Sequence, residues 1–174
     1  IWGDGTISEG ANPPAHFYRN ASYTNELHYN LKLVAKSANG CTADSTIRII
    51  VHPKVEADFE ISTLSGCAPL NVSFMDKSKG AVEEESGWYI REGSENEFSF
   101  VDHDVLQYTF ENTSSAAKTY EVMYVARNRG GCADSVVKEV VVQPAVVADF
   151  SAAPQNTYSG QKATFSNDAL IPGV

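Results

Sequence analysis

The chain repeats itself at a fixed interval, and this repeat limits the folds that it can adopt. Cys41 and Cys132 are 91 residues apart, and Pro53 and Pro144 are separated by the same interval. Several landmarks at one period indicate an internal repeat. The period is too long for a solenoid unit and matches a small independent domain, which needs roughly 50–200 residues. We therefore expect similar domains in tandem.

Within the repeat, apolar and polar residues alternate. The segments "YNLKLVAK" (29–36), "PLNVSF" (69–74) and "YEVMYVAR" (120–127) place every second side chain on one apolar face. A period of two predicts a strand with one buried face. Clusters of Gly, Asn and Ser separate these segments, as in polar turns. Several short strands per repeat predict an all-β, antiparallel sandwich.

Composition excludes some classes of partner. Of the 174 residues, 43% are hydrophobic, which is enough for a core. No apolar run reaches the roughly 18 residues of a membrane span. The net charge is −9 with no stripe of Lys and Arg, which argues against nucleic acid or anionic membranes as partners.

The residues give no indication of catalysis. The four histidines lie outside any His-Glu-x-x-His motif, and there is no Gly-x-Ser-x-Gly or phosphate-binding glycine loop. We therefore expect no enzyme. Two acidic stretches, Asp102–Asp104 and Glu83–Glu85, are interpreted as solvated loops, with a metal site as the alternative. Three Asn-x-Ser/Thr triplets begin at Asn20, Asn71 and Asn112, and each matches the N-glycosylation pattern.

Four segments carry a resemblance to a known family. They are "IWGDG" (1–5), "SANGC" (37–41), "GCAPLNVSF" (66–74) and "WYIREG" (88–93). In order and spacing they resemble the PKD domain, an immunoglobulin-like β-sandwich found in extracellular arrays. The last segment departs from the family's Gly-Asp-Gly turn, because Arg91-Glu92 stands in place of Gly-Asp.

The resemblance implies a division into three units. Residues 1–53 would be the C-terminal part of one PKD domain, residues 54–144 a complete domain, and residues 145–174 the N-terminal part of a third. Each boundary is a proline followed at once by a new strand, which predicts short, stiff joints. We expect the apolar face of residues 1–53 to be covered by preceding chain or by a partner.

Within the PKD layout, Cys67 and Cys132 belong to one domain, and we expect a disulfide between them. Cys41 would then stay unpaired in this segment. The alternatives are three reduced thiols, or a Cys41–Cys67 bond across the domain boundary. A structural disulfide implies an oxidising compartment, outside the cytoplasm.

A set of mostly aromatic residues is predicted to form the core of the complete domain, because the inward aromatics of such a sandwich pack between its sheets. The alternative is an exposed platform for sugars. The predicted core residues are Phe59, Phe74, Trp88, Tyr120, Val122 and Tyr124.

The resemblance favours a non-catalytic structural or adhesive rod segment of a large extracellular or cell-surface protein. Similar arrays occur in Bacteroidota, where they are exported by type IX secretion and take part in gliding adhesion. The expected partners are neighbouring PKD domains, a surface glycan or protein, and a secretion or outer-membrane component. Some PKD domains bind calcium, so calcium is the one cofactor considered. The alternatives are an accessory carbohydrate- or protein-binding module of a secreted hydrolase, and an assembly partner in a membrane complex.

Overall fold

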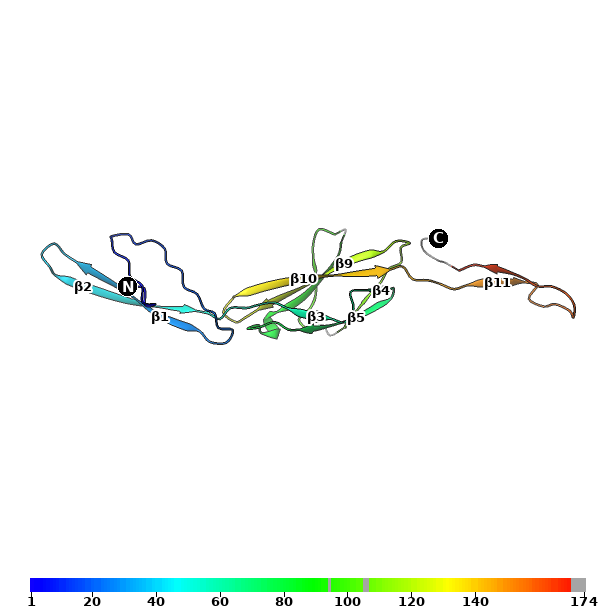
Figure 1. Ribbon diagram of the computed structural model, residues 1–174, viewed down its shortest axis with the longest axis horizontal. Coiled ribbons are helices and arrows are strands. Elements are labelled where there is room, and N and C mark those ends of the chain that lie inside the picture. Colours follow the sequence, from blue (N-terminus) through cyan, green and yellow to red (C-terminus); the bar gives the residue numbers. More distant parts are fainter. Residues whose placement is uncertain (94, 105–106, 170–174) are drawn as a thin grey trace.

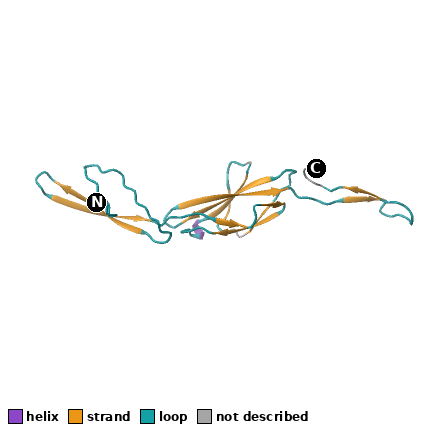
Figure 2. Cartoon of the chain, viewed as in Figure 1, coloured by secondary structure: helices purple, strands orange, loops and turns teal. Residues whose placement is uncertain are grey.

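The computed structural model describes residues 1–93, 95–104 and 107–169, and the fold of this part is all-β (Figures 1 and 2). Its helical content is one turn of 3₁₀ helix, η1 (Glu83–Glu85). The strands form four separate sheets, two of which belong to the middle of the chain. A two-stranded hairpin lies at each end of an elongated molecule (Figure 1).

The middle of the chain folds into two facing sheets. The larger sheet has the strand order β4-β10-β9-β6-β7, and the smaller one has the order β3-β5-β8. All pairings are antiparallel except that of β4 with β10. The strands are β3 (Phe59–Ile61), β4 (Ser65–Cys67), β5 (Leu70–Asp76), β6 (Gly87–Glu92), β7 (Ser99–Asp102), β8 (Gln107–Phe110), β9 (Lys118–Arg127) and β10 (Ala133–Gln143).

One apolar core fills the space between these two sheets. Phe59, Phe74, Trp88, Val122 and Tyr124 are buried in it. The Trp88 ring lies at the centre, with centroid distances of 5.0 Å to Phe59, 5.2 Å to Phe74 and 4.3 Å to Tyr124. Such close aromatic contacts add to the stabilisation that comes from burial.

Tyr120, the sixth predicted core residue, is only partly buried against this core. Its position near the start of β9 brings the ring to the edge of the sandwich. There its hydroxyl donates a hydrogen bond to the backbone oxygen of Glu111 at 2.6 Å. A tyrosine in this place fixes the loop that precedes the strand, as the tyrosine corner does in immunoglobulin-like sandwiches.

The interval of 91 residues recurs in the pairing of the strands. The hairpin of β1 (Leu27–Lys36) and β2 (Thr42–Val51) has the same register as β9 and β10 when it is shifted by 91. The hairpin of β11 (Phe150–Ala153) and β12 (Thr164–Asn167) likewise has the register of β3 and β5. Because register decides which side chains face the core, equivalent positions of each pair point to the same face.

Candidate functional site

The best-defined contact between parts of the chain is found at Pro53, just after β2. We call it the Pro53 joint. A β-bridge between Glu56 and Lys79 lies beside it, with backbone hydrogen bonds of 3.0 and 2.9 Å in the two directions. The Pro53 joint comprises Tyr23, His52, Pro53, Lys54, Glu56, Lys79, Gly80, Asn128 and Gly130.

Asn128 connects the central sandwich to Pro53. Its Oδ1 accepts hydrogen bonds from the backbone nitrogens of Gly130 and Cys132, both at 3.0 Å, and so closes its own turn. Its Nδ2 donates to the backbone oxygen of Pro53 at 2.9 Å. In the first copy the equivalent residue is Ser37, whose Oγ accepts a hydrogen bond from the backbone nitrogen of Cys41 at 3.1 Å. The longer amide side chain of Asn128 therefore allows one residue both to close its own turn and to bind Pro53.

Tyr23 forms the other side of the joint. Its hydroxyl donates a hydrogen bond to Glu56 Oε2, and Lys54 Nζ lies over its ring at 4.2 Å from the centroid. Lys79 is also near this ring and forms an ion pair with Glu56 at 3.5 Å. Cations over an aromatic face are attracted to it.

These contacts shift the pKa values of two side chains in the joint. The hydrogen bonds from Tyr23 and Lys54, together with the charge of Lys79, lower the pKa of Glu56. The hydrogen bonds to Tyr23 and Glu56 raise the pKa of Lys54. Both shifts favour the charged forms, so the ion pairs persist across neutral pH.

Two glycines permit the close approach at the joint. A Cβ atom on Gly80 would lie 2.4 Å from the backbone oxygen of Lys54 and 2.9 Å from that of Tyr23. A Cβ on Gly130 would lie 2.5 Å from Cγ of His52. The His52 ring is held in place by Glu26, at 2.8 Å from Nδ1. The joint is therefore close-packed on two sides.

The Gly-Asp-Gly turn near the start of the chain satisfies its own polar groups. Asp4 accepts hydrogen bonds from Thr6, at 3.0 Å from the backbone nitrogen and 2.6 Å from Oγ1, and lies 2.6 Å from His16 Nε2. The bonds from Thr6, and then that from His16, hold the pKa of Asp4 well below its usual range. Trp2 stacks on the His16 ring at 4.7 Å. This arrangement stabilises the turn.

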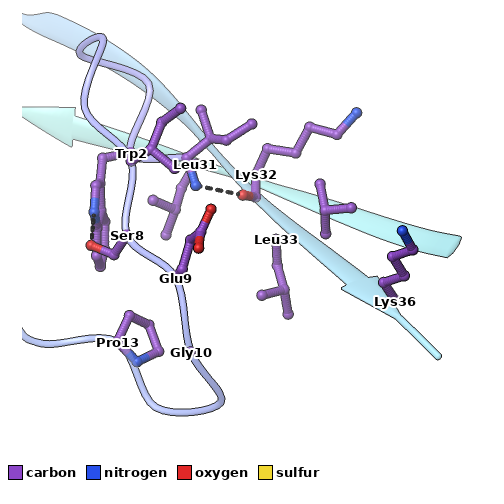
Figure 3. Close-up of a pocket in the computed structure, with 12 residues that line it drawn as sticks. Trp2, Ser8, Glu9, Gly10, Pro13, Leu31, Lys32, Leu33 and Lys36 are labelled. Carbon is purple, nitrogen blue, oxygen red and sulfur yellow. Dashed lines mark hydrogen bonds between the residues drawn. The ribbon is translucent and has the colours of Figure 1, made fainter. Parts of the chain in front are cut away.

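An apolar groove lies beside that turn, between the loop of residues 1–13 and β1 (Figure 3). Its volume is about 610 Å³. Trp2 and Pro13 form one side, and Leu31 and Leu33 of β1 face it from the other. The terminal amine of Ile1 donates to the backbone oxygen of Lys32 at 3.1 Å and fixes the loop against the strand.

The predicted disulfide between Cys67 and Cys132 is wrong. Cys67 pairs with Gln143 at the end of β10, whereas Cys132 immediately precedes the start of that strand. Cys132 and Gln143 are eleven residues apart along this extended strand. At roughly 3.3 Å per residue, Cys67 and Cys132 are therefore separated by roughly 36 Å. All three cysteines, including Cys41, are free thiols. The cysteines therefore give no support to an oxidising compartment, and an extracellular location stays a prediction.

The acidic stretches form no ion-binding arrangement in the part of the chain that the structure describes, where no three His, Cys, Asp or Glu side chains are grouped to hold a metal. Glu84 of η1 instead pairs with Arg129 at 3.4 Å. Asp102 accepts a hydrogen bond from the adjacent backbone nitrogen of His103. Arg91, in the place of the family's glycine, forms an ion pair with Glu121.

Two of the three Asn-x-Ser/Thr triplets serve the fold. Asn112 is 2% exposed, and its Nδ2 donates to the backbone oxygens of Ala116 and Val142, both at 2.8 Å. Asn20 makes the equivalent bonds to Asn25 and Val51. Because both hydrogens of each amide are donated to the backbone, a glycan on either nitrogen would break one of these bonds in the folded chain.

Comparison with known proteins gives no relative: no family model matches the chain, and no curated protein sequence matches it. No helix in the described residues is long and apolar enough to cross a membrane. Membership of the PKD family therefore stays a prediction, while the all-β architecture and the internal repeat are features of the structure.

Proposed function

We propose that the chain is a non-catalytic rod segment of a larger extracellular or cell-surface protein, with a structural or adhesive role. The observation that carries this proposal is the Pro53 joint. It links one hairpin unit to a complete sandwich through contacts on several sides, along the long axis of the molecule (Figure 1).

The joint supports a rod because a hinge motion there would break specific contacts. Bending away from Asn128 would break its bond to Pro53, and bending towards Gly80 would force the backbone of Lys54 into the central sandwich. A buried polar group that loses its partner costs about 1–3 kcal/mol. Proline limits rotation at the same point. The first hairpin and the central sandwich are therefore held in one orientation.

The cellular setting of the proposal comes from the resemblance to PKD arrays. This resemblance suggests neighbouring PKD domains as partners and a distal glycan or protein as the ligand. It also suggests export by a secretion system such as the type IX route. A carbohydrate-binding module is less well supported. The rings of Phe100 and His103 meet edge to face at 5.1 Å, so these two rings do not form one continuous stacking surface.

Single-molecule energy transfer across the joint tests the proposal. Dyes on the exposed Cys41 and Cys67, in a Cys132→Ser background, report the distance between the first hairpin and the far end of the sandwich. We expect one narrow distance distribution. Gly80→Ala should broaden it, because the added Cβ overlaps two backbone oxygens.

Gly160→Ala, in the C-terminal hairpin and away from the joint, is the matched control. Gly160 has a φ of 87°, close to the 73° of Gly80, but a Cβ there would meet no atom within 4 Å. It should reproduce the backbone strain and leave the distance distribution narrow. A broad distribution in the unmodified chain would overturn the rod proposal.

A further inference from the structure

Cys67 and Cys132 lie at opposite ends of the central sandwich, and each of these ends is joined to another unit of the repeat. Cys132 belongs to the turn at the Pro53 joint, whereas Cys67 lies beside Gln143, the residue before Pro144. Cys67 is exposed and Cys132 is partly exposed. Neither cysteine can therefore reach the other within one unit, but each lies at a junction with a neighbouring unit.

The interval of 91 shows where the counterpart of Cys67 from a preceding unit would lie at the Pro53 joint. Cys67 is the register partner of Gln143, and His52 is the counterpart of Gln143 at this interval. Neighbouring strands are about 4.8 Å apart, and paired residues of one sheet direct their side chains to the same face. A cysteine in the position of Cys67 would therefore have its side chain next to that of His52, on the same face.

The turn that contains Cys132 packs against this same His52 side chain. A Cβ atom on Gly130 would lie 2.5 Å from Cγ of His52, so the backbone of the turn is in contact with the ring. The backbone nitrogens of Gly130 and Cys132 both lie 3.0 Å from Oδ1 of Asn128, which keeps Cys132 close to Gly130. The two cysteine positions, one from each unit, thus converge on one residue. A disulfide needs Cα atoms about 4.4–6.8 Å apart, which such neighbours can satisfy.

We propose that a disulfide crosses the joint between two units that carry these cysteines, from Cys67 of one unit to Cys132 of the next. This proposal rests on the tandem rod, because it needs successive units. The two thiols are oxidised to one disulfide, while a disulfide of the oxidant, such as that of a thiol oxidoreductase, is reduced to two thiols that take up the two protons. The bond fixes covalently the same contact that Asn128 makes by a hydrogen bond to Pro53.

The same geometry excludes a bond between Cys41 and Cys67. Cys41 is the counterpart of Cys132 at the interval of 91, and it immediately precedes β2, at the end of that strand away from the Pro53 joint. Cys67 lies beyond the other end of the central sandwich, beside Gln143. The thiol of Cys41 is therefore placed for a preceding unit, as that of Cys132 is placed for the unit that ends at Pro53.

The test duplicates residues 54–144 in tandem within the 174-residue chain. The upstream duplicate then supplies Cys67, and the downstream duplicate supplies Cys132, to a joint of the same kind. Both chains are equilibrated with reduced and oxidised glutathione, free thiols are alkylated, and disulfide-linked peptides of the monomer are identified by mass spectrometry. We expect a peptide that links Cys67 to Cys132 from the duplicated chain, and no such peptide from the unmodified chain, where the two thiols are at opposite ends of one unit.

Two serine variants identify the cysteines that react. Cys67→Ser in the upstream duplicate should abolish the linked peptide, whereas Cys67→Ser in the downstream duplicate should leave it unchanged. A duplicated chain without the linked peptide, an equal effect of the two variants, or the same link in the monomeric unmodified chain would refute the disulfide between units. The rod role is tested separately, because the distance distribution across the Pro53 joint is measured in a chain that lacks this bond.

Discussion

At the scale of single residues, one asparagine side chain in each of the first two copies makes hydrogen bonds that strand pairing does not supply. Asn112 and Asn20 bind backbone oxygens of loops and of the last strand of their copies. A buried backbone oxygen needs such a partner, because leaving it unpaired is costly. The sequence pattern that suggested glycosylation therefore has a structural origin at these two positions.

Asn112→Ala should destabilise the central sandwich by about 3 kcal/mol, because it removes two hydrogen bonds and leaves the buried oxygen of Val142 without a partner. Chemical denaturation measures the loss. Asn71→Ala, at an exposed position on β5, should change stability by less than about 0.5 kcal/mol. Equal effects of the two variants would contradict the structural role of Asn112.

Tyr124 should make the fold sensitive to alkali. Burial raises the pKa of Tyr124 to about 12, whereas an unfolded tyrosine ionises near pH 10. Its contribution is therefore complete below about pH 10 and is lost as the pH rises towards about 12. Tyr124→Phe should reduce this alkaline loss to the share of Tyr18 and Tyr120, whose pKa values desolvation also raises. It forfeits the 3.0 Å bond to Asp76, worth about 1 kcal/mol at neutral pH.

Denaturation curves between neutral pH and pH 11 would reveal the difference. Tyr158→Phe serves as the control, because Tyr158 is largely exposed and its removal should leave the alkaline loss unchanged. If Tyr124→Phe loses stability with pH as steeply as the unmodified chain, another group is responsible.

At the scale of elements, alternation along the chain was enough to predict the strands and most of the core, because it depends only on neighbouring residues. The predicted disulfide was wrong because Cys67 lies beside the C-terminal end of β10, whereas Cys132 precedes its N-terminal end. This placement follows from the direction in which β4 pairs with β10, which alternation along the chain does not reveal. The Pro53 joint could not be predicted, since Asn128 and Pro53 are 75 residues apart and meet only in the folded chain.

Within β5, the two faces of the strand should respond differently to truncation. Phe74→Ala should cost about 4 kcal/mol, because Phe74 is 4% exposed and contacts Phe59 and Trp88 in the core. Met75→Ala, on the opposite face, should cost less than about 1 kcal/mol. Thermal denaturation of both variants would measure this contrast, and a comparable loss at Met75 would mean that the outer face is also covered.

At the scale of the whole molecule, the two proline junctions differ. At the interval of 91, Lys54 and Glu56 of the Pro53 joint are replaced by Ala145 and Val147. The contacts that the two charged side chains make with Tyr23 and Lys79 therefore have no counterpart after Pro144. Val146 and Val147 are exposed, whereas Val55 is partly buried against the core. The charged side chains at the first junction are therefore replaced by apolar, exposed ones at the second.

Limited digestion with elastase, which cleaves after small aliphatic residues, should cut the chain after Ala145 to Val147 before it cuts near Val55. Exposed and weakly anchored segments are the preferred sites of proteolysis. Mass spectrometry of the early products identifies the site, and Gly80→Ala should add cleavage near Val55 by opening the Pro53 joint. First cleavage near Val55 in the unmodified chain would contradict the difference between the junctions.

The parallel pairing of β4 with β10 has a mechanical consequence. The backbone nitrogen of Val141 donates to Leu64 at 2.8 Å, and that of Ala68 donates to Gln143 at 2.9 Å, at the point where the chain leaves the sandwich. Tension between the two ends of this unit pulls the two strands past each other lengthwise. Shear of this kind loads all the hydrogen bonds between β4 and β10 at once, whereas peeling would break them one after another. The pairing at which the chain leaves the sandwich therefore also resists its extension.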